Sequence, residues 1–430
     1  MTSEYRTCVD VRVSGHGAVT RRGFLRRVSA GAAALAGMHW FDRVNLFADE
    51  LRKQERHCIL LWMAGGPSQF ETFDPKPGAE TQGPTKAIDT AVPGVRIAEH
   101  WKQVAGIAKD LAIIRSMTSK EGNHGRATYL LHTGYSPSGG ITHPGIGSIV
   151  ANELGDSHFD LPYFVSISGP SAGPSFLGVR YAPFMISDPN RPPDNLPSPV
   201  ADRRLKRRLG LLKELEVPLA RTGAAPLVRD HQMLYDQTAQ MVLSPRTKAF
   251  DLDQESEKAR HTYGRSAFGQ GCLMARRLIE AGVTFVEVQS SGWDTHGNEL
   301  ASLKNLIPPV DRATVALITD LKARGLLDKT LVIWMGEFGR TPQINLTAGR
   351  DHFPRVFNAA LAGAGVKGGQ VIGASDRLGT DVAERPVTVP DLFCTFCQAL
   401  GIDPRKENQS DVGRPLKIVE HGRVVKEVFG

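Results

Sequence analysis

Cysteine is scarce in this chain of 430 residues, which has only five. Five cysteines in so long a chain do not make a disulfide scaffold. Long apolar runs are also absent, because no stretch reaches the ~18–20 residues that a bilayer-spanning helix needs. The composition of 41% hydrophobic and 23% charged residues is too mixed for a disordered or fibrous protein. These absences leave a globular protein with material for one large core or two smaller ones.

An excess of positive charge is missing from most of the chain, although the formal net charge is +7. Residues 1–48 hold seven arginines and three acidic residues, which accounts for +4 of the total. The remainder of the chain is almost neutral, so it has no electrostatic reason to bind a phosphate backbone. We therefore predict no nucleic-acid partner.

The N-terminal segment combines an arginine pair with a short apolar stretch. Residues 20–25 read Thr-Arg-Arg-Gly-Phe-Leu, and the Ala/Gly-rich residues 28–37 follow. This pattern resembles a twin-arginine (Tat) signal, which predicts that residues 1–48 are an export segment and that the protein is periplasmic or in the cell envelope. A basic amphipathic helix is the alternative interpretation. An uncleaved signal that serves as an anchor would be the chain's sole membrane span.

From residue 57 onward, apolar runs alternate with helical patterns. The runs that predict buried strands are residues 58–63, 111–114, 164–167, 284–288 and 330–335. Helical patterns over about 266–281 and 310–321 end near Gly282 and Gly325. This order predicts one α/β domain over residues 49–430, with a mostly parallel central sheet and helices on both faces.

Residues 180–260 depart from this alternation, and we predict a helical insertion there. A Pro-rich stretch precedes the basic run Arg203–Arg208, and leucines follow at 209, 211, 212 and 215. The basic run could bind an anion. A solvated helix face with the leucine stripe packed beneath it is the interpretation that the pattern favours.

Two loops that follow predicted strands carry acidic and imidazole side chains. Asp294 and His296 stand two apart in a Gly-flanked loop, so both could turn toward one cation. Glu337 follows the strand at 330–335, and Arg340 comes three residues later. Glu337 could be a metal ligand or a general base, with Arg340 orienting it or binding an anionic substrate. An Asx-turn and a structural Glu–Arg pair are the respective alternatives.

Three further segments supply candidate site residues. Asp351 and His352 could provide a further ligand and its orienting partner, or Asp351 could cap a helix. His124 and Arg126 lie between glycines at the start of a predicted helix, whose N-terminus favours an anion. Ser68 follows the first strand as a candidate nucleophile, with a turn hydroxyl as the alternative.

Two familiar motifs do not fit the chemistry that they usually signal. Cys394 and Cys397 lie within a helical apolar pattern, where two thiols are badly placed for a disulfide and no second pair completes a zinc site. Residues 169–173 read Gly-Pro-Ser-Ala-Gly, but no helix pattern follows them as a nucleophile elbow requires. We interpret the first as core packing and the second as a plain loop.

Three of these segments together resemble one known family. They are the Tat-like residues 20–25, the Gly-Trp-Asp-Thr-His loop at 292–296, and residues 330–342 followed by Asp351 and His352. They are similar to the exported bacterial "domain of unknown function 1501" family, over nearly the whole chain. That family is grouped with the alkaline phosphatase/sulfatase superfamily, so the resemblance implies an alkaline phosphatase/sulfatase-like fold. It also implies Asp294, His296, Glu337 and His352 as metal ligands, with Asp351 nearby.

The chain departs from that superfamily where it usually places a strand-1 aspartate and a covalent nucleophile. Gly65 and Gly66 follow the first strand, and residues 122–124 stand where sulfatases have a modified Cys or Ser. The resemblance therefore favours a protein with one divalent metal ion that activates a water to hydrolyse phosphate or sulfate esters. Arg126 or Arg340 would neutralise the anionic ester, and His124 would be a general acid. The alternative is a binding or assembly protein on the same fold with a degenerate active site.

Overall fold

The structure, a computed structural model, describes residues 55–194, 196 and 200–430. The twin-arginine segment predicted at 1–48 lies outside the described residues. Residues 55–430 form one compact unit. Among the described residues, no helix combines the length and the apolar character needed to cross a membrane.

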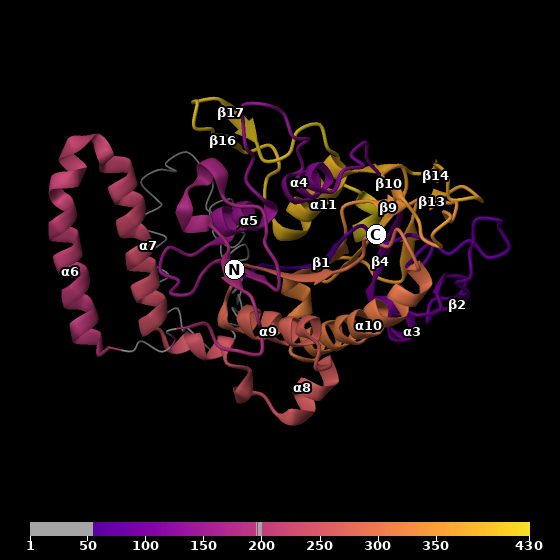
Figure 1. Ribbon diagram of the computed structural model, residues 1–430, viewed down its shortest axis with the longest axis horizontal. Coiled ribbons are helices and arrows are strands. Elements are labelled where there is room, and N and C mark those ends of the chain that lie inside the picture. Colours follow the sequence, from indigo (N-terminus) through magenta and orange to yellow (C-terminus); the bar gives the residue numbers. More distant parts are fainter. Residues whose placement is uncertain (1–54, 195, 197–199) are drawn as a thin grey trace, which may run out of the picture. The chain divides into compact units, whose positions relative to one another are not determined.

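A single large sheet forms the centre of this unit (Figure 1). Its main strand order is β12-β4-β11-β8-β1-β7-β5-β6, and β15 also pairs with β4. In chain order the strands are β1 (His57–Ala64), β4 (Ala112–Thr118), β5 (Phe164–Ile167), β6 (Phe184–Ile186), β7 (Phe285–Ser291), β8 (Thr330–Met335), β11 (Phe357–Ala362), β12 (Gln370–Ile372) and β15 (Val387–Thr388). All pairs are parallel except those made by β11, which runs antiparallel to both β8 and β4. The predicted mostly parallel α/β sheet is confirmed.

Helices cover both faces of the sheet, as predicted (Figure 1). Alternate residues of β1 divide between two apolar cores, with Ile59, Leu61 and Met63 in one and Cys58, Leu60 and Trp62 in the other. The first core is covered by α3 (Lys102–Gly106), α9 (Ala267–Ala281) and α10 (Glu299–Ala323). The second is covered by α4 (His124–Thr133), α5 (Ile146–Leu154) and α11 (Val389–Leu400). A strand buried on both faces explains why β1 is continuously apolar.

The strand register brings three carboxyl ends to one place. β1 lies between β7 and β8, with Ala64 opposite Ser291 and Trp62 opposite Met335. The loops that follow these three strands therefore start side by side at one edge of the sheet, which is where open α/β sheets place their ligands.

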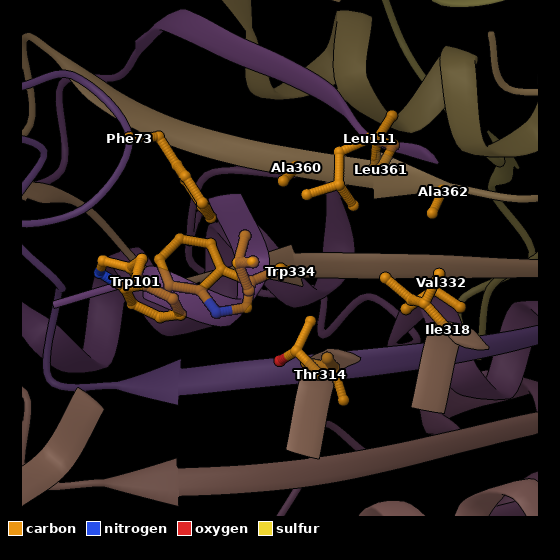
Figure 2. A pocket seen from close by; sticks show the side chains of 12 residues that line it. Phe73, Trp101, Leu111, Thr314, Ile318, Val332, Trp334, Ala360, Leu361 and Ala362 are labelled. Carbon is orange, nitrogen blue, oxygen red and sulfur yellow. The ribbon is translucent and has the colours of Figure 1, made fainter. Parts of the chain in front are cut away.

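An aromatic cluster supports this edge from the first core. The rings of Phe73 and Trp101 pack on Trp334 of β8, with centroid distances of 4.8 Å and 5.6 Å (Figure 2). They line a cavity of about 10 Å³, room for about one water molecule, and its other walls are almost entirely aliphatic. Trp101 also stacks on Trp293, the residue before Asp294. The cluster thus holds the base of the loop that carries Asp294.

The region from 180 to 260 contains a pair of antiparallel helices, α6 (Asp202–Leu219) and α7 (Ala225–Leu243), followed by α8 (Glu257–Tyr263) (Figure 1). The leucine stripe that we expected to be packed beneath α6 is divided. Leu209 and Leu212 are half-buried, but Leu211 and Leu215 remain 52% and 74% exposed. The expectation was wrong for the exposed pair because, in the described part of the chain, α7 is the helix that packs along α6, and it covers one side.

In the described part of the chain, four two-stranded sheets lie outside the main sheet, and the sequence patterns did not predict them. They are formed by β2 (Ala87–Asp89) with β3 (Arg96–Ala98), β9 (Gly339–Arg340) with β10 (His352–Phe353), β13 (Ala374–Ser375) with β14 (Val382–Glu384), and β16 (Glu407–Gln409) with β17 (Pro415–Lys417). The strands are two or three residues long, too short for an alternating pattern to emerge. One of these sheets, β9–β10, helps to build the site described next.

Candidate metal centre

A polar cluster occupies the edge where β7, β1 and β8 end. Asp294 follows β7, and Glu337 follows β8. Trp293 is fully buried, and its indole Nε1 donates to the Ser290 hydroxyl over 3.0 Å. This anchor leaves Asp294, the next residue, 45% exposed at the rim of the sheet.

The backbone of Gly65, the residue after β1, connects the loops that follow β7 and β8. Its N–H donates to both carboxylate oxygens of Glu337, at 2.9 Å and 3.1 Å. Gly65 has a φ of +123°, and a Cβ there would lie 2.4 Å from the backbone nitrogen of Asp294. Only glycine allows the chain to pass so close in this conformation. Glu337 is thereby fixed as a buried acceptor behind the cluster.

Arg340 holds Asp294 in its ionised form. The fully buried guanidinium donates to Asp294 Oδ1 over 2.6 Å and to the backbone carbonyls of Gly65, Gly66, Trp293 and Arg350. Partial burial, the largest single effect, would raise the pKa of Asp294, but the hydrogen bond and charge of Arg340, together with His352 and His124, lower that pKa to about 2. Since all of its nitrogens already have partners, Arg340 is a structural cation.

The β9–β10 hairpin brings His352 to Asp294, where it meets His296 from the loop that follows β7. In this hairpin His352 is paired with Arg340. His352 Nε2 lies 3.2 Å from Asp294 Oδ1, and His296 Nε2 lies 3.0 Å from the same oxygen. The two Nε2 atoms are only 2.9 Å apart. Three potential ligand atoms therefore form a triangle about 3 Å on a side.

Each imidazole is oriented by an acceptor on its other nitrogen. Nδ1 of His296 lies 2.7 Å from Asp351 Oδ1, and Nδ1 of His352 lies 2.8 Å from the carbonyl of Gly122. These oxygens only accept, so both Nδ1 atoms carry hydrogen, and the lone pair of each ring, when the ring is neutral, is on Nε2. The hydrogen bond from His296 lowers the pKa of Asp351. Two Nε2 atoms in contact cannot both carry a hydrogen pointing at the other.

His124, the first residue of α4, approaches the other carboxylate oxygen of Asp294. Its Nδ1 lies 2.8 Å from Glu337, and this hydrogen bond raises the pKa of His124. Its Nε2 is buried and has no hydrogen-bond partner, although Asp294 Oδ2 lies 3.3 Å away. A buried nitrogen without a partner is costly in a folded protein unless something else satisfies it.

These atoms fit a divalent cation. One ligand atom each from His124, Asp294 and His352 lie within 4.8 Å of one another, and His296 adjoins the last two. Zinc bonds to nitrogen and oxygen of about 2.0–2.2 Å place the ligands of a tetrahedral site roughly 3.3–3.5 Å apart. The observed separations of 2.9–3.3 Å are within a few tenths of an ångström of that value. Carboxylates or carbonyls on the far ring nitrogens are the usual supports of metal-bound histidines.

The structure brings together most of the residues that the sequence singled out. His124, Asp294, His296, Glu337, Arg340, Asp351 and His352 all belong to the one cluster. Two candidates face elsewhere. Ser68 is buried with its hydroxyl on Glu71, and Arg126 is exposed with two 2.7 Å bonds to Glu121. Their side chains are engaged in these local contacts.

Three supporting groups were missed by sequence reasoning. The Gly65 N–H and the Gly122 carbonyl act through the backbone, so no residue type could reveal them. Asn345 donates to Asp351 Oδ1 over 3.2 Å and to the carbonyl of His296 over 3.0 Å. An Asn six residues before an Asp-His pair was the sole available signal, and it is a weak one.

The chain belongs to a family that is described as "Protein of unknown function (DUF1501)", whose model matches residues 55–429. No curated protein is similar in sequence to this chain. Solved structures with some likeness include the phosphonate monoester hydrolase of Agrobacterium radiobacter (14% identity, 87% of this chain and 77% of that chain, TM-score 0.38). The PsFucS1 sulfatase from Pseudoalteromonas sp. is 12% identical over 83% and 70% of the chains, with a TM-score of 0.38. The lipoteichoic acid synthase LtaP from Listeria monocytogenes is 10% identical over 82% and 74%, with a TM-score of 0.40. Likenesses of this size carry no information on the reaction.

Proposed function

We propose that this member of the DUF1501 family is an exported, metal-dependent hydrolase of phosphate or sulfate esters, of the alkaline phosphatase/sulfatase type. One observation carries the metal part of the proposal: the Nε2 atoms of three histidines converge on Asp294 while their Nδ1 atoms are held by acceptors. Imidazoles with fixed far nitrogens and an ionised carboxylate form a donor set for a divalent cation such as zinc.

The residues divide into ligands and supports in this proposal. Asp294, His352, His124 and His296 would hold the cation. Glu337 and Asp351 orient two of the imidazoles, and Arg340 keeps Asp294 ionised. When bound, the cation supplies Lewis acidity, which lowers the pKa of a water ligand and polarises an ester oxygen. His124 is thus assigned as a ligand in place of a general acid.

Water is the nucleophile that the described residues favour. Among residues 55–194, 196 and 200–430, no Ser, Thr or Cys side chain makes a hydrogen bond to the imidazoles or the carboxylate of the four ligands. Ser68 is 1% exposed and hydrogen-bonded to Glu71, which argues against a role as a covalent nucleophile. Hydrolysis would then proceed in one displacement, without a covalent enzyme intermediate.

The engagement of Arg340 supports a second candidate function. This cation is fully buried, and each of its nitrogens already bonds a carbonyl or Asp294, so an anionic ester does not reach it. Arg126 could reach an ester only by leaving Glu121. A binding protein that holds an anionic ligand through its cation, with no turnover, is therefore the alternative.

Metal content tests the site directly. The protein should be purified without chelators and without a metal-leaching tag, and its metals measured by mass spectrometry. We expect about one divalent ion per chain in the wild type and less than a tenth of that in D294A/H296A. The chain offers a matched control in Asp156 and His158, a second Asp-x-His in an exposed loop. D156A/H158A should retain the metal, and equal loss in both variants would refute the assignment.

Turnover separates the hydrolase from the binding protein. The metal-loaded protein should release nitrophenol from an aryl phosphate, phosphonate or sulfate, and D294A/H296A should not. Metal retention without turnover of any of these esters would favour the binding protein. Loss of both metal and turnover in the wild type would remove both candidates.

Export is a separate part of the proposal and rests on the Thr-Arg-Arg-Gly-Phe-Leu segment alone. The paired substitution R21K/R22K should retain the protein in the cytoplasm, while the wild type appears in the periplasmic or envelope fraction. R26K/R27K, the neighbouring arginine pair, is the matched control and should be exported normally. Equal export of the two variants would contradict the twin-arginine route.

A further inference from the structure

The helical hairpin α6–α7 carries an unusual share of the exposed apolar side chains. Eight of the twelve large hydrophobic residues that are exposed in the described part of the chain lie on it: Leu211, Leu215, Val217, Leu219, Leu227, Met233, Leu234 and Tyr235. α6 lies outside α7, farther from the central sheet (Figure 1). Isolated exposed leucines are ordinary, but a group of this size on one element marks an interaction surface.

The helical repeat sorts these side chains onto two sides of the hairpin. On α6, a stripe at steps of four and three residues runs through Arg204, Arg208, Leu211, Leu215 and Leu219. On α7, the corresponding stripe runs through Leu227, His231, Leu234 and Thr238. We call the surface made by these nine residues the leucine–arginine face. Val217 and Met233 fall on the opposite side.

Contacts within the hairpin show that both stripes share one side. Glu216 of α6 is buried and bonds His231 of α7, and the Lys213–Asp236 pair (2.8 Å) links the helices along the opposite side. Each stripe comes one residue before the positions that face the partner helix, such as Leu212 and Glu216 on α6 and Val228 on α7. Because the helices are antiparallel, the same rotation about each axis turns both stripes to one side.

The charge of the leucine–arginine face indicates which kind of partner it binds. Neither stripe contains Asp or Glu, and the basic residues Arg204 and Arg208 continue the leucine row toward the start of α6. Leucines flanked by arginines, with no carboxylate among them, form the surface of a helix that lies in the interface of an anionic membrane. A second copy of the chain would offer no carboxylate on its own face to pair with these arginines.

The size of the face also argues against a second copy. An 18-residue helix is about 27 Å long, and two adjacent helices are about 20 Å wide, so the face measures roughly 500 Å². A stable dimer buries about 800 Å² on each partner. We propose that the hairpin docks the protein on an anionic lipid surface through its leucine–arginine face. This docking is independent of the metal centre and of the reaction proposed there.

Vesicle flotation with the full chain tests this docking. The wild type should float with vesicles of phosphatidylglycerol and phosphatidylcholine, and much less with phosphatidylcholine alone. L215S/L227S should bind the anionic vesicles at least tenfold more weakly. Its matched control is V217S/M233S, which removes two exposed apolar side chains of the same helices from the other side and should bind within about twofold of the wild type. All variants keep the same N-terminus, so differences among them report on the hairpin.

Two variants that remove positive charge complete the test. R204Q/R208Q should weaken binding about tenfold or more at low salt, as expected when two basic residues leave an anionic surface. R203Q/K206Q, which changes neighbouring cations outside the face, should bind more strongly than R204Q/R208Q. The proposal would be overturned if the wild type failed to float, or if L215S/L227S and V217S/M233S bound the anionic vesicles equally well. It would also be overturned if sedimentation showed a dimer that L215S/L227S dissociates while vesicle binding stays unchanged.

Discussion

Two clusters of histidine and carboxylate side chains lie on β7, and they differ in whether their imidazole nitrogens are free to bind a ligand. At the middle of the strand, Glu287 is fully buried beside His132, whose Nε2 lies 3.3 Å from it and whose Nδ1 lies 2.8 Å from the carbonyl of Thr128. Ser171 donates to the other oxygen of Glu287 over 2.5 Å. At the end of the strand, three imidazoles meet at one carboxylate.

The inner cluster, at the middle of β7, and the outer cluster, at its end, differ in the free lone pairs of their imidazoles and in their exposure to solvent. Burial, the largest single effect, would lower the pKa of His132, but the charge and hydrogen bond of Glu287, together with the Thr128 carbonyl and Glu337, raise that pKa. Both ring nitrogens donate, so the inner cluster is a closed imidazolium–carboxylate pair with nothing free for a ligand. In the outer cluster His124 Nε2 has no partner, and Asp294 is 45% exposed. Both clusters combine imidazole with a carboxylate, and the spare lone pairs of the outer one support the metal site that we propose.

The largest contrast is expected from removing one histidine from each cluster. H352A should reduce the metal content at least tenfold because it deletes one of the converging nitrogens. H132A should leave the metal content of the folded protein unchanged because His132 has no free nitrogen. Metal analysis of the two variants, side by side, checks this. A loss of metal in H132A alone would reverse the roles that we assign to the clusters.

For the free energy of unfolding we expect the larger effect in the inner cluster, where Glu287 pairs with His132. E287A leaves the His132 imidazolium buried without its partner, and removal of one member of a buried pair costs about 3–5 kcal/mol. The free energy of unfolding, measured in urea without added metal, should fall by that amount. E121A, which breaks a pair with the exposed Arg126, is the control and should cost far less than E287A. Similar losses in both variants would contradict the closed-pair interpretation.

Ser171 distinguishes a structural hydroxyl from a nucleophile. Its Gly-x-Ser-x-Gly context is the one that we interpreted as a plain loop, and its hydroxyl points to Glu287. S171A should lower stability by about 1.5–3 kcal/mol because a hydrogen bond to a charged group is lost. Turnover of aryl esters per folded molecule should be unchanged. Abolished turnover with full metal content would make Ser171 a catalytic residue.

A pH effect of smaller size is expected from Glu299, behind the outer cluster. Burial, and then the nearby Glu71 carboxylate, raise the pKa of Glu299 to about 8. A carboxyl whose pKa is raised on folding adds stability below its unfolded pKa, and this contribution is lost as the pH rises through about 8. The loss is at most about 1.4 kcal/mol per pH unit. The melting temperature of E299Q should therefore fall less than that of the wild type between pH 6 and pH 8. A parallel fall in both proteins would contradict the raised pKa.

The long elements of the fold could be predicted because burial on both faces marks a strand in the sequence itself. The run at 330–335 coincides with β8, and the helix ending at Gly282 coincides with α9. β11 was not predicted because Phe357–Ala362 is rich in alanine and has no β-branched residue. Its antiparallel insertion between β4 and β8 depends on partners far away in the chain. On α6, the pattern gave the helix, but it could not tell which leucines α7 would cover.

The sequence by itself determined which side chains stand at the ends of strands, because alternating apolar runs and polar loops are local features. It therefore singled out Asp294, His296 and Glu337 as candidates at the ends of strands, but it did not show that they converge. Only the tertiary structure decided that they share one edge of the sheet, and which of them we propose as ligands and which as supports. The direction in which a ring nitrogen points depends on acceptors such as the Gly122 carbonyl, which is 230 residues from His352 in the chain. A lone pair becomes free or engaged through such distant contacts, and no local pattern records them.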